Sequence, residues 1–204
     1  MLSLHCGLKN YLARKMIDLF EDIKGDDKVE FETKRVAVFV DGSNFFYAQK
    51  KMGWDVCPER LLKFCKQFGN IVEATYYSGE SNDPKQKRFF DFLAYNGYSL
   101  VTKPLKTIYD HETGQITRKS NLDIEVALDM FNQIDRYDVA ILVSGDSDFQ
   151  RALQLLKSRG KEVKVVSARG IVATELVQTV GINYIDFHSI REGVERTNEL
   201  THTA

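Results

Sequence analysis

Residues 138–149, with the sequence DVAILVSGDSDF, contain both the pattern that determines the fold and the residues that suggest chemistry. The apolar run 138–143 has the length and composition of a strand that is buried on both faces of a sheet. Asp146 and Asp148 follow it almost at once, with one residue between them. Two carboxylates this close repel each other, so the stretch raises the question of what neutralises their charge.

Similar apolar runs recur along the chain and alternate with helical patterns. Further strands are predicted over residues 35–40, 71–78, 98–103, 162–167 and 183–187. Helices are predicted over residues 44–52, 58–68, 84–96, 121–134, 148–158 and 171–179. This alternation predicts an α/β fold, a Rossmann-like three-layer α/β/α sandwich in which a mainly parallel sheet lies between two layers of helices.

The chain divides into three parts by composition. Residues 1–33 contain an amphipathic helix at 8–24 and a polar linker, residues 34–190 form the α/β domain, and residues 191–204 form a polar C-terminal tail. The N-terminal helix is expected to pack as an appendage, with self-association into a homo-oligomer as the alternative. Residues 104–120 interrupt the alternation and predict a small β-hairpin insertion.

The composition is that of a soluble globular protein of the cytoplasm. Apolar residues make up 43% of the chain and charged residues 28%. No apolar run approaches the ~18 residues of a membrane span, and no secretory signal is recognisable. Three cysteines without a C-x-x-C pair indicate a reducing compartment. Four histidines lack metal-ligand spacing, so any metal is expected to have oxygen ligands.

The net charge of −1 argues against a protein that coats nucleic acid through bulk charge. A local basic rim around an acidic centre is still compatible with it.

Four acidic residues are predicted to meet at one edge of the sheet. In an open parallel sheet, ligands bind beyond the carboxyl ends of the strands. Asp41 follows the first strand, and Asp146 and Asp148 follow the fourth. Right-handed crossovers allow these two strands to be neighbours. Asp123 lies in the first turn of the helix with the sequence NLDIEVALDMF, near the same edge.

The orientation of that helix determines which of its acidic residues faces the site. The spacing of its apolar residues predicts a core face of Ile124, Ala127, Leu128 and Phe131. Asp123 lies just beside this stripe, whereas Glu125 and Asp129 are expected on more solvated faces. We therefore favour Asp123 as the acidic residue that this helix contributes.

A cluster of three or four carboxylates normally persists because a cation neutralises it. All-oxygen ligands favour a hard cation, Mg²⁺ or Mn²⁺. Such an ion often binds phosphate groups, activates water and stabilises charge on phosphoryl oxygens. The cluster therefore predicts metal-dependent hydrolysis of a phosphodiester bond.

A purely structural explanation also exists for the acidic residue after the first strand. Asp41 stands where a helix cap is needed, although Ser43 and Asn44 are able to cap as well. Asn44 taken alone is more readily explained as a cap than as a ligand.

The pair after the fourth strand has a weaker structural explanation. Asp148 would favour the positive end of a helix. Ser147 and Gln150, however, have the spacing of a capping box. Asp146 is then left without an evident structural role, which favours a functional one.

Basic and aromatic residues near this edge are candidates for contacts with a nucleic acid. A basic rim for a phosphate backbone would consist of Lys85, Lys87, Arg88, Lys103, Lys106, Arg118 and Lys119. Such charge runs are more often solvated faces. The aromatic residues that are candidates for stacking on bases are Phe45, Phe46, Tyr47 and Trp54. Core packing is the simpler explanation for most of them.

Four stretches in this order, VFVDGSNFFY, RKSNLDIEVALDM, ILVSGDSDF and EVKVVS, resemble the NYN family of PIN-like domains, and within it the LabA-like group. The resemblance covers residues 34–188. It implies a Rossmann-like α/β/α fold related to PIN nucleases, with an acidic site that binds a divalent metal and cleaves RNA, single-stranded or structured. The carboxylates implied by this resemblance, as catalytic residues and metal ligands, are Asp41, Asp123, Asp146 and Asp148.

The same resemblance implies roles for neighbouring polar residues. Asn44 would help to position metal or water, and Lys119 would face phosphate. The candidate substrate-binding residues are Asn44, Lys119, Ser144 and Ser43. In the helix motif, a lysine is followed by an aspartate that Asp123 fits, with Asp129 as the alternative.

Two functions follow from these patterns. The first is a divalent-metal-dependent ribonuclease that hydrolyses RNA phosphodiester bonds. The alternative is a catalytically silent regulatory module that binds RNA or metal. Other phosphate-binding folds fit poorly, because a dehalogenase-type phosphatase would have aspartate in place of Ser43 and a Toprim domain would have glutamate in place of Asp41. No P-loop motif occurs, and DGSNFF does not match the dinucleotide-binding motif.

Overall fold

The computed structural model describes residues 33–109 and 116–197, with the backbone alone for 106–109 and 116–119. The predicted N-terminal helix at 8–24 and the turn of the predicted hairpin lie outside the described residues.

Six parallel strands form the central sheet of the described residues. They are β1 (Arg35–Asp41), β2 (Asn70–Glu80), β3 (Ser99–Pro104), β6 (Val139–Val143), β7 (Glu162–Ser167) and β8 (Tyr184–Asp186). Their order across the sheet is β3-β2-β1-β6-β7-β8. The predicted parallel sheet is therefore confirmed, and its central strands β1 and β6 are apolar along their length because both faces are covered.

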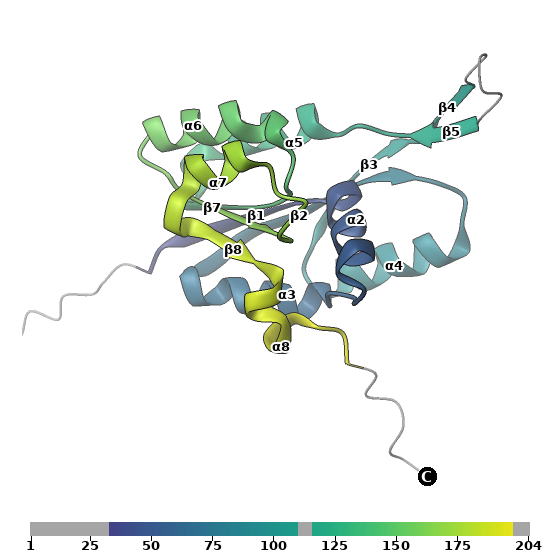
Figure 1. The fold of residues 1–204 in the computed structure, drawn as a ribbon, viewed down its shortest axis with the longest axis horizontal. Helices are drawn as coiled ribbons and strands as arrows, with labels where there is room; N and C mark the ends of the chain where they lie inside the picture. Colours follow the sequence, from purple (N-terminus) through teal and green to yellow (C-terminus); the bar gives the residue numbers. More distant parts are fainter. Residues whose placement is uncertain (1–32, 110–115, 198–204) are drawn as a thin grey trace, which may run out of the picture. The chain divides into compact units, whose positions relative to one another are not determined.

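Helices cover both faces of this sheet (Figure 1). One layer contains α2 (Gly42–Met52), α3 (Pro58–Cys65), α4 (Pro84–Tyr95) and α8 (Arg191–Val194). The other layer contains α5 (Asp123–Asn132), α6 (Gln150–Ser158) and α7 (Thr174–Val180). The predicted three-layer α/β/α sandwich is confirmed.

The pleat of β1 shows how the two cores are separated. Val36, Val38 and Val40 pack into the core beneath α2, α3 and α4, whereas Ala37 and Phe39 pack into the core beneath α5 and α6. Successive residues of a strand point to opposite faces, so both sets must be apolar.

Helix ends follow local signals in the sequence. α3 and α4 both begin with proline, whose fixed backbone angle suits the first helical position. Asp83 caps α4 by accepting a hydrogen bond from the backbone N–H of Lys85. α2 ends at Gly53, which has a φ of 74° in the left-handed region. The helix predicted over 58–68 is shorter in the structure, because α3 ends at Cys65 and residues 66–68 form a separate 3₁₀ turn.

The predicted core face of α5 is wrong for Ile124 and Leu128, whereas Phe131 is partly buried and packs against the core. The buried residues are Leu122, Val126 and Met130, whereas Ile124 and Leu128 are mostly exposed to solvent. Both sets have helical spacing, because α5 carries apolar residues on two sides. Periodicity alone does not indicate which of the two stripes packs against the sheet.

Asp129 points toward the sheet rather than toward solvent, which corrects a second expectation for α5. The hydroxyl of Tyr77 on β2 donates a hydrogen bond to Oδ2 of Asp129 over 2.9 Å. Tyr77 is fully buried, so this bond fixes α5 against the sheet at a defined rotation.

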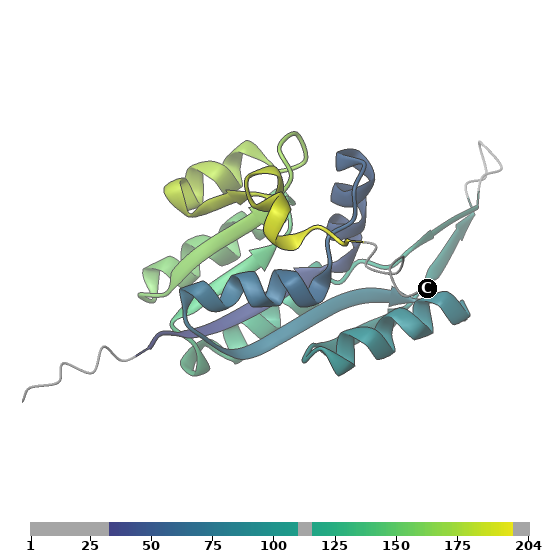
Figure 2. The ribbon, with the colours of Figure 1, turned by 90° about the horizontal axis from the view of Figure 1, so that it is seen from below.

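The predicted hairpin insertion is present as a two-stranded antiparallel sheet. β4 (Lys106–Tyr109) pairs with β5 (Ile116–Lys119), and Lys106 stands opposite Lys119. Figure 2 shows both arms leaving the body of the domain beyond the ends of the long strands β2 and β3. Because β5 ends shortly before α5 begins, the insertion leads directly to the residues around Asp123.

The chain from residue 191 packs against the domain, where the sequence analysis placed a polar tail. Val194 is fully buried, and its carbonyl accepts a hydrogen bond from the backbone N–H of Cys57. Glu195 forms a β-bridge with Val56. The packed domain therefore includes α8, with Val194 as the residue that is buried in the core.

Among the described helices, none has the length and apolar character required to cross a membrane.

Candidate functional site

The candidate site lies where the strand order reverses. β1 pairs in parallel with β6, and Val40 stands opposite Val143 at their carboxyl ends. The chain proceeds from β1 to β2 on one side of this point, and from β6 to β7 on the other. Side chains beyond β1 and β6 therefore face the crevice in which open α/β sheets bind ligands. The two strands are neighbours, as the sequence analysis allowed.

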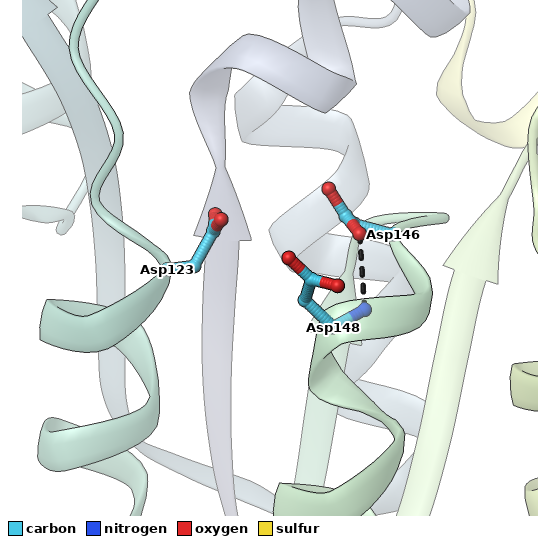
Figure 3. Close-up of side chains that lie close together, drawn as sticks. All are labelled: Asp123, Asp146 and Asp148. Carbon is cyan, nitrogen blue, oxygen red and sulfur yellow. Dashed lines mark hydrogen bonds between the residues drawn. The ribbon is translucent and has the colours of Figure 1, made fainter.

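Three of the four predicted aspartates come together at this point. One carboxylate oxygen from each of Asp123, Asp146 and Asp148 lies within 4.8 Å of the other two. Asp123 is the first residue of α5, and Asp148 lies in a 3₁₀ turn, Ser147–Phe149, that precedes α6. Figure 3 shows the carboxylates of Asp146 and Asp148 on one side and that of Asp123 facing them from α5.

Local hydrogen bonds hold the loop after β6 in place. Oδ1 of Asp146 accepts a hydrogen bond from the backbone N–H of Asp148 over 3.0 Å. Asp146 therefore caps the short 3₁₀ turn, and the expectation that it has no structural role is wrong. The predicted capping box at Ser147 is wrong as well, because α6 has no side-chain cap. Phe149 is the next residue, and its burial in the core fixes the end of this loop.

Asp123 is positioned by contacts at the start of α5. The side-chain oxygen of Asn121 accepts a hydrogen bond from the backbone N–H of Asp123 over 2.8 Å. Nζ of Lys103 on β3 donates to Oε1 of Glu125 over 2.6 Å and to the carbonyl of Asn121 over 3.5 Å. Lys103 therefore neutralises Glu125 and ties this helix end to the sheet. The sequence analysis did not identify this role.

Asp41 is the buried member of the site and serves as the cap of α2. Its Oδ1 accepts hydrogen bonds from the backbone N–H groups of Ser43 and Asn44, over 3.0 and 3.1 Å. Its Oδ2 accepts a hydrogen bond from Oγ of Ser144 over 3.0 Å. The structural explanation for Asp41 therefore holds, since both of its oxygens are engaged within the fold. Asp41 is not among the three aspartates whose oxygens converge.

Asn44 joins the two turns that carry the acidic residues. Its side-chain oxygen accepts a hydrogen bond from the backbone N–H of Gly145 over 2.8 Å. Each turn also contains a glycine that a neighbouring strand approaches closely. A Cβ atom on Gly42 would lie 2.5 Å from the carbonyl oxygen of Tyr77, and one on Gly145 would lie 2.8 Å from Oγ of Ser167. The glycines in DGSN and SGDSD were a signal for these close approaches of Tyr77 and Ser167 that the sequence analysis left unused.

The aspartates form one electrostatic unit. Burial raises the pKa of Asp41, and the charge of Asp146 raises it further. Burial also raises the pKa of Asp123, with added repulsion from Asp41, Asp146 and Asp148. No described lysine or arginine side chain forms a salt bridge with any of the four. Within the described part of the chain, the negative charge of the cluster is therefore left to be balanced from solution.

The remaining predicted residues differ in what the structure says about them. Ser43 is exposed beside the site, whereas Ser144 is buried and bonded to Asp41. Lys119 ends β5, but its side chain lies outside the description, as do those of Lys106 and Arg118.

Among the other residues of the predicted basic rim, Lys85, Lys87 and Arg88 are exposed on α4. They therefore lie in the helix layer opposite α5.

The order β3-β2-β1-β6-β7-β8 is 3-2-1-4-5-6 when only the strands of the central sheet are counted along the chain, which is the order of a Rossmann-type sheet. The class of protein is therefore an α/β protein with an acidic cluster at the switch point of the sheet. The chain belongs to the NYN domain family, which matches residues 35–200.

One relative supports this family assignment, and one solved structure supports the fold. The chain is 40% identical over 173 residues to the low amplitude and bright protein LabA of Synechococcus elongatus, which covers 82% of this chain and 91% of that protein. This relationship confirms the resemblance to the LabA-like group. The crystal structure of a protein of unknown function from Vibrio parahaemolyticus has a TM-score of 0.70 at 24% identity, covering 82% of this chain and 99% of that one. This similarity confirms the fold.

Proposed function

We propose that this protein is a divalent-metal-dependent ribonuclease that hydrolyses RNA phosphodiester bonds at the cluster of Asp123, Asp146 and Asp148. The observation that carries the proposal is the convergence of three carboxylate oxygens within 4.8 Å at the switch point of the sheet. Membership of the NYN family supports RNA as the substrate, since NYN domains generally bind RNA. A cytoplasmic location, as the cysteine content predicts, would place the enzyme together with RNA.

The donor set fits Mg²⁺ or Mn²⁺. All of its donors are carboxylate oxygens, which hard divalent cations prefer. Two oxygens on opposite sides of Mg²⁺ at about 2.1 Å stand about 4.2 Å apart. The limit of 4.8 Å between the aspartate oxygens therefore requires only small side-chain rotations. When bound, such a cation activates water and stabilises charge on the phosphoryl oxygens.

The chain's own residues would divide the work. Asp123, Asp146 and Asp148 would hold the metal, and Asp41 would contribute negative charge while it fixes the start of α2. Asn44 uses its side-chain oxygen for Gly145, so its amide N–H groups are the atoms left to donate to a phosphate oxygen. We place Ser43, which is exposed at the start of α2, next to the substrate.

A second candidate is a catalytically silent module that binds RNA or metal. One observation favours it. Both oxygens of Asp41 are engaged by Ser43, Asn44 and Ser144, so the fourth carboxylate is not a free ligand in this arrangement. RNA binding without cleavage at any metal concentration would support this function over the first.

The direct test is cleavage of a labelled single-stranded RNA by pure protein with Mn²⁺, Mg²⁺ or EDTA. Asp146→Asn removes a ligand charge but keeps a side chain that caps well, so the loop after β6 should retain its shape. Asp83→Asn is the matched control, because Asp83 caps α4 in the same way. Cleavage should require metal, persist in Asp83→Asn and disappear in Asp146→Asn. Cleavage that survives both EDTA and Asp146→Asn would rule out this site.

A further inference from the structure

Two aromatic side chains on α2 project into solvent. Phe46 is 51% exposed and Tyr47 is 63% exposed, whereas Phe45 and Trp54 on the same segment are buried. The rings of Phe46 and Tyr47 lie edge to face with centroids 5.8 Å apart. Adjacent large aromatic rings that are not packed into the core form an apolar surface, and such surfaces often mark a binding site.

A cation accompanies the aromatic pair. Nζ of Lys50 lies 4.7 Å from the centroid of the Phe46 ring, one helical turn further along α2. Lys50 forms no salt bridge with any described carboxylate. Its charge is therefore available to a negatively charged ligand that also contacts the rings.

The pair lies on the helix whose first turn contacts the loop of the acidic cluster, because Asn44 accepts a hydrogen bond from the backbone N–H of Gly145, next to Asp146. Ser43 donates its backbone N–H to Asp41, and Tyr47 follows four residues later on the same helix. At about 1.5 Å of rise per residue, the two positions are about 6 Å apart along the axis. That is roughly two nucleotides at the 3.4 Å spacing of stacked bases. One RNA strand is thus able to reach from the first turn of α2, which the loop of the cluster contacts, to the rings.

A surface hollow of about 270 Å³ adjoins the pair at the far end of α2. It is lined by Phe46, Gln49, Lys50, Gly53, Trp54 and Asp55. Nε1 of Trp54 is buried and has no hydrogen-bond partner among the described residues. The hollow thus combines an aromatic wall with a lysine and a carboxylate, which suits the face and the polar edge of a nucleobase.

We propose that Phe46, Tyr47 and Lys50 form a subsite for unpaired bases of single-stranded RNA beside the acidic cluster. The inference rests on the proposed function for its substrate class and adds a preference for single strands. Aromatic side chains stack on bases only when these are splayed out of a duplex. Lys50 favours RNA over a protein partner, because a phosphate backbone complements the lysine.

The test is the affinity of the full-length protein for a short fluorescent single-stranded RNA, measured by anisotropy in EDTA to prevent cleavage. The double variant Phe46→Ala and Tyr47→Ala should weaken binding roughly tenfold or more, because the free energy of stacking bases on the two rings is lost. Lys50→Ala should reduce the slope of log affinity against log salt by about 0.7, whereas the aromatic variant should leave that slope unchanged.

Matched variants control for folding and for general surface effects. Tyr95→Ala removes an aromatic ring that is 91% exposed at the end of α4, and it should bind as the wild type does. Phe46→Tyr with Tyr47→Phe keeps both rings and should bind normally. Affinity for a duplex RNA of the same sequence should not depend on Phe46 and Tyr47.

Several outcomes would overturn the subsite. Unchanged single-strand affinity in the aromatic variant is one, and an equal loss of duplex affinity is another. A change in sedimentation without a change in RNA affinity would identify a protein contact instead.

The two proposals are separable by the same experiments. Ring-dependent RNA binding without metal-dependent cleavage would remove the nuclease and keep the subsite. If loss of the rings changes neither metal-dependent cleavage nor RNA binding, the subsite is removed and the nuclease is kept. Failure of the wild-type protein both to bind RNA in EDTA and to cleave it with Mn²⁺ or Mg²⁺ would remove both.

Discussion

Oγ of Ser144 donates a hydrogen bond to Oδ2 of Asp41 over 3.0 Å and accepts one from the backbone N–H of Asp146 over 3.2 Å. One hydroxyl therefore connects the buried carboxylate after β1 with the loop after β6 that carries two members of the acidic cluster. Asn44 and Gly145 make a second connection between the same two turns. The positions of Asp146 and Asp148 thus depend on hydrogen bonds between the turn after β1 and the loop after β6.

Removing this hydroxyl should destabilise the protein. Ser144→Ala leaves Oδ2 of Asp41 buried without a donor, which costs about 1–3 kcal/mol. The melting temperature should fall by about 2–4 °C for each kcal/mol. Scanning calorimetry measures the change, and Ser158→Ala at the exposed end of α6 serves as the control. An unchanged melting temperature in Ser144→Ala would contradict the role assigned to the hydroxyl.

Neutralising Asp123 should stabilise the metal-free protein. The pKa of Asp123 is raised in the folded state above its ordinary value of 3.8 by burial and by Asp41, Asp146 and Asp148. Its contribution to stability is therefore greatest below that value and is lost as pH rises through the folded pKa. At neutral pH the charge is a cost, so Asp123→Asn should raise the melting temperature by about 1–3 °C.

The same variant should lose the stabilisation that Mn²⁺ confers on the wild type. Thermal shift assays with and without Mn²⁺ measure both effects. Asp91→Asn, on the exposed face of α4, should show neither. A lower melting temperature for metal-free Asp123→Asn would be inconsistent with the repulsion inferred here.

Metal binding should strengthen as pH rises. The ligands must lose their protons, and the raised pKa of Asp123 moves this change above pH 3.8. Mn²⁺ should therefore bind more weakly at about pH 5 than at about pH 7.5, with release of protons. Titration calorimetry in two buffers of different ionisation enthalpy detects the protons. Equal affinity at both pH values, without proton release, would argue against a carboxylate site.

The Tyr77–Asp129 hydrogen bond should contribute to the stability of α5. Tyr77→Phe removes the donor and leaves a carboxylate facing the sheet unpaired, which should lower the free energy of unfolding by about 1–3 kcal/mol. Urea denaturation measures the loss. Combining Tyr77→Phe with Asp129→Ala should cost less than the sum of the two single changes, because the residues are in contact. Strict additivity would mean that the bond has no effect on stability.

Glycine should be essential at the start of α2. A Cβ atom at Gly42 would lie 2.5 Å from the carbonyl oxygen of Tyr77 and 2.7 Å from the ring of Tyr76. Gly42→Ala should therefore destabilise the protein by about 1–3 kcal/mol or more. Gly193→Ala is the control, because nothing lies within 4 Å of that Cβ position. Urea denaturation of both variants distinguishes them, and equal stability would show that α2 shifts without cost.

The sequence by itself determined the layers and the edge at which the aspartates meet. Apolar runs such as 138–143 are typical of strands that are buried on both faces. Their alternation with helices predicts a parallel sheet with helices on both sides. Because parallel strands share one carboxyl edge, the aspartates after β1 and β6 had to lie on the same side. These conclusions need only local patterns and chain connectivity.

Tertiary structure alone decided the roles of individual side chains. α5 has two apolar stripes, and only packing on the sheet selected Val126 and Met130 over Ile124 and Leu128. Asp41 became the cap of α2, and Phe46 and Tyr47 remained exposed while Phe45 was buried. Burial and partner choice depend on residues distant in the chain, such as Tyr77 for Asp129 and Ser144 for Asp41. Periodicity therefore specifies which elements form, whereas their packing specifies which atoms meet.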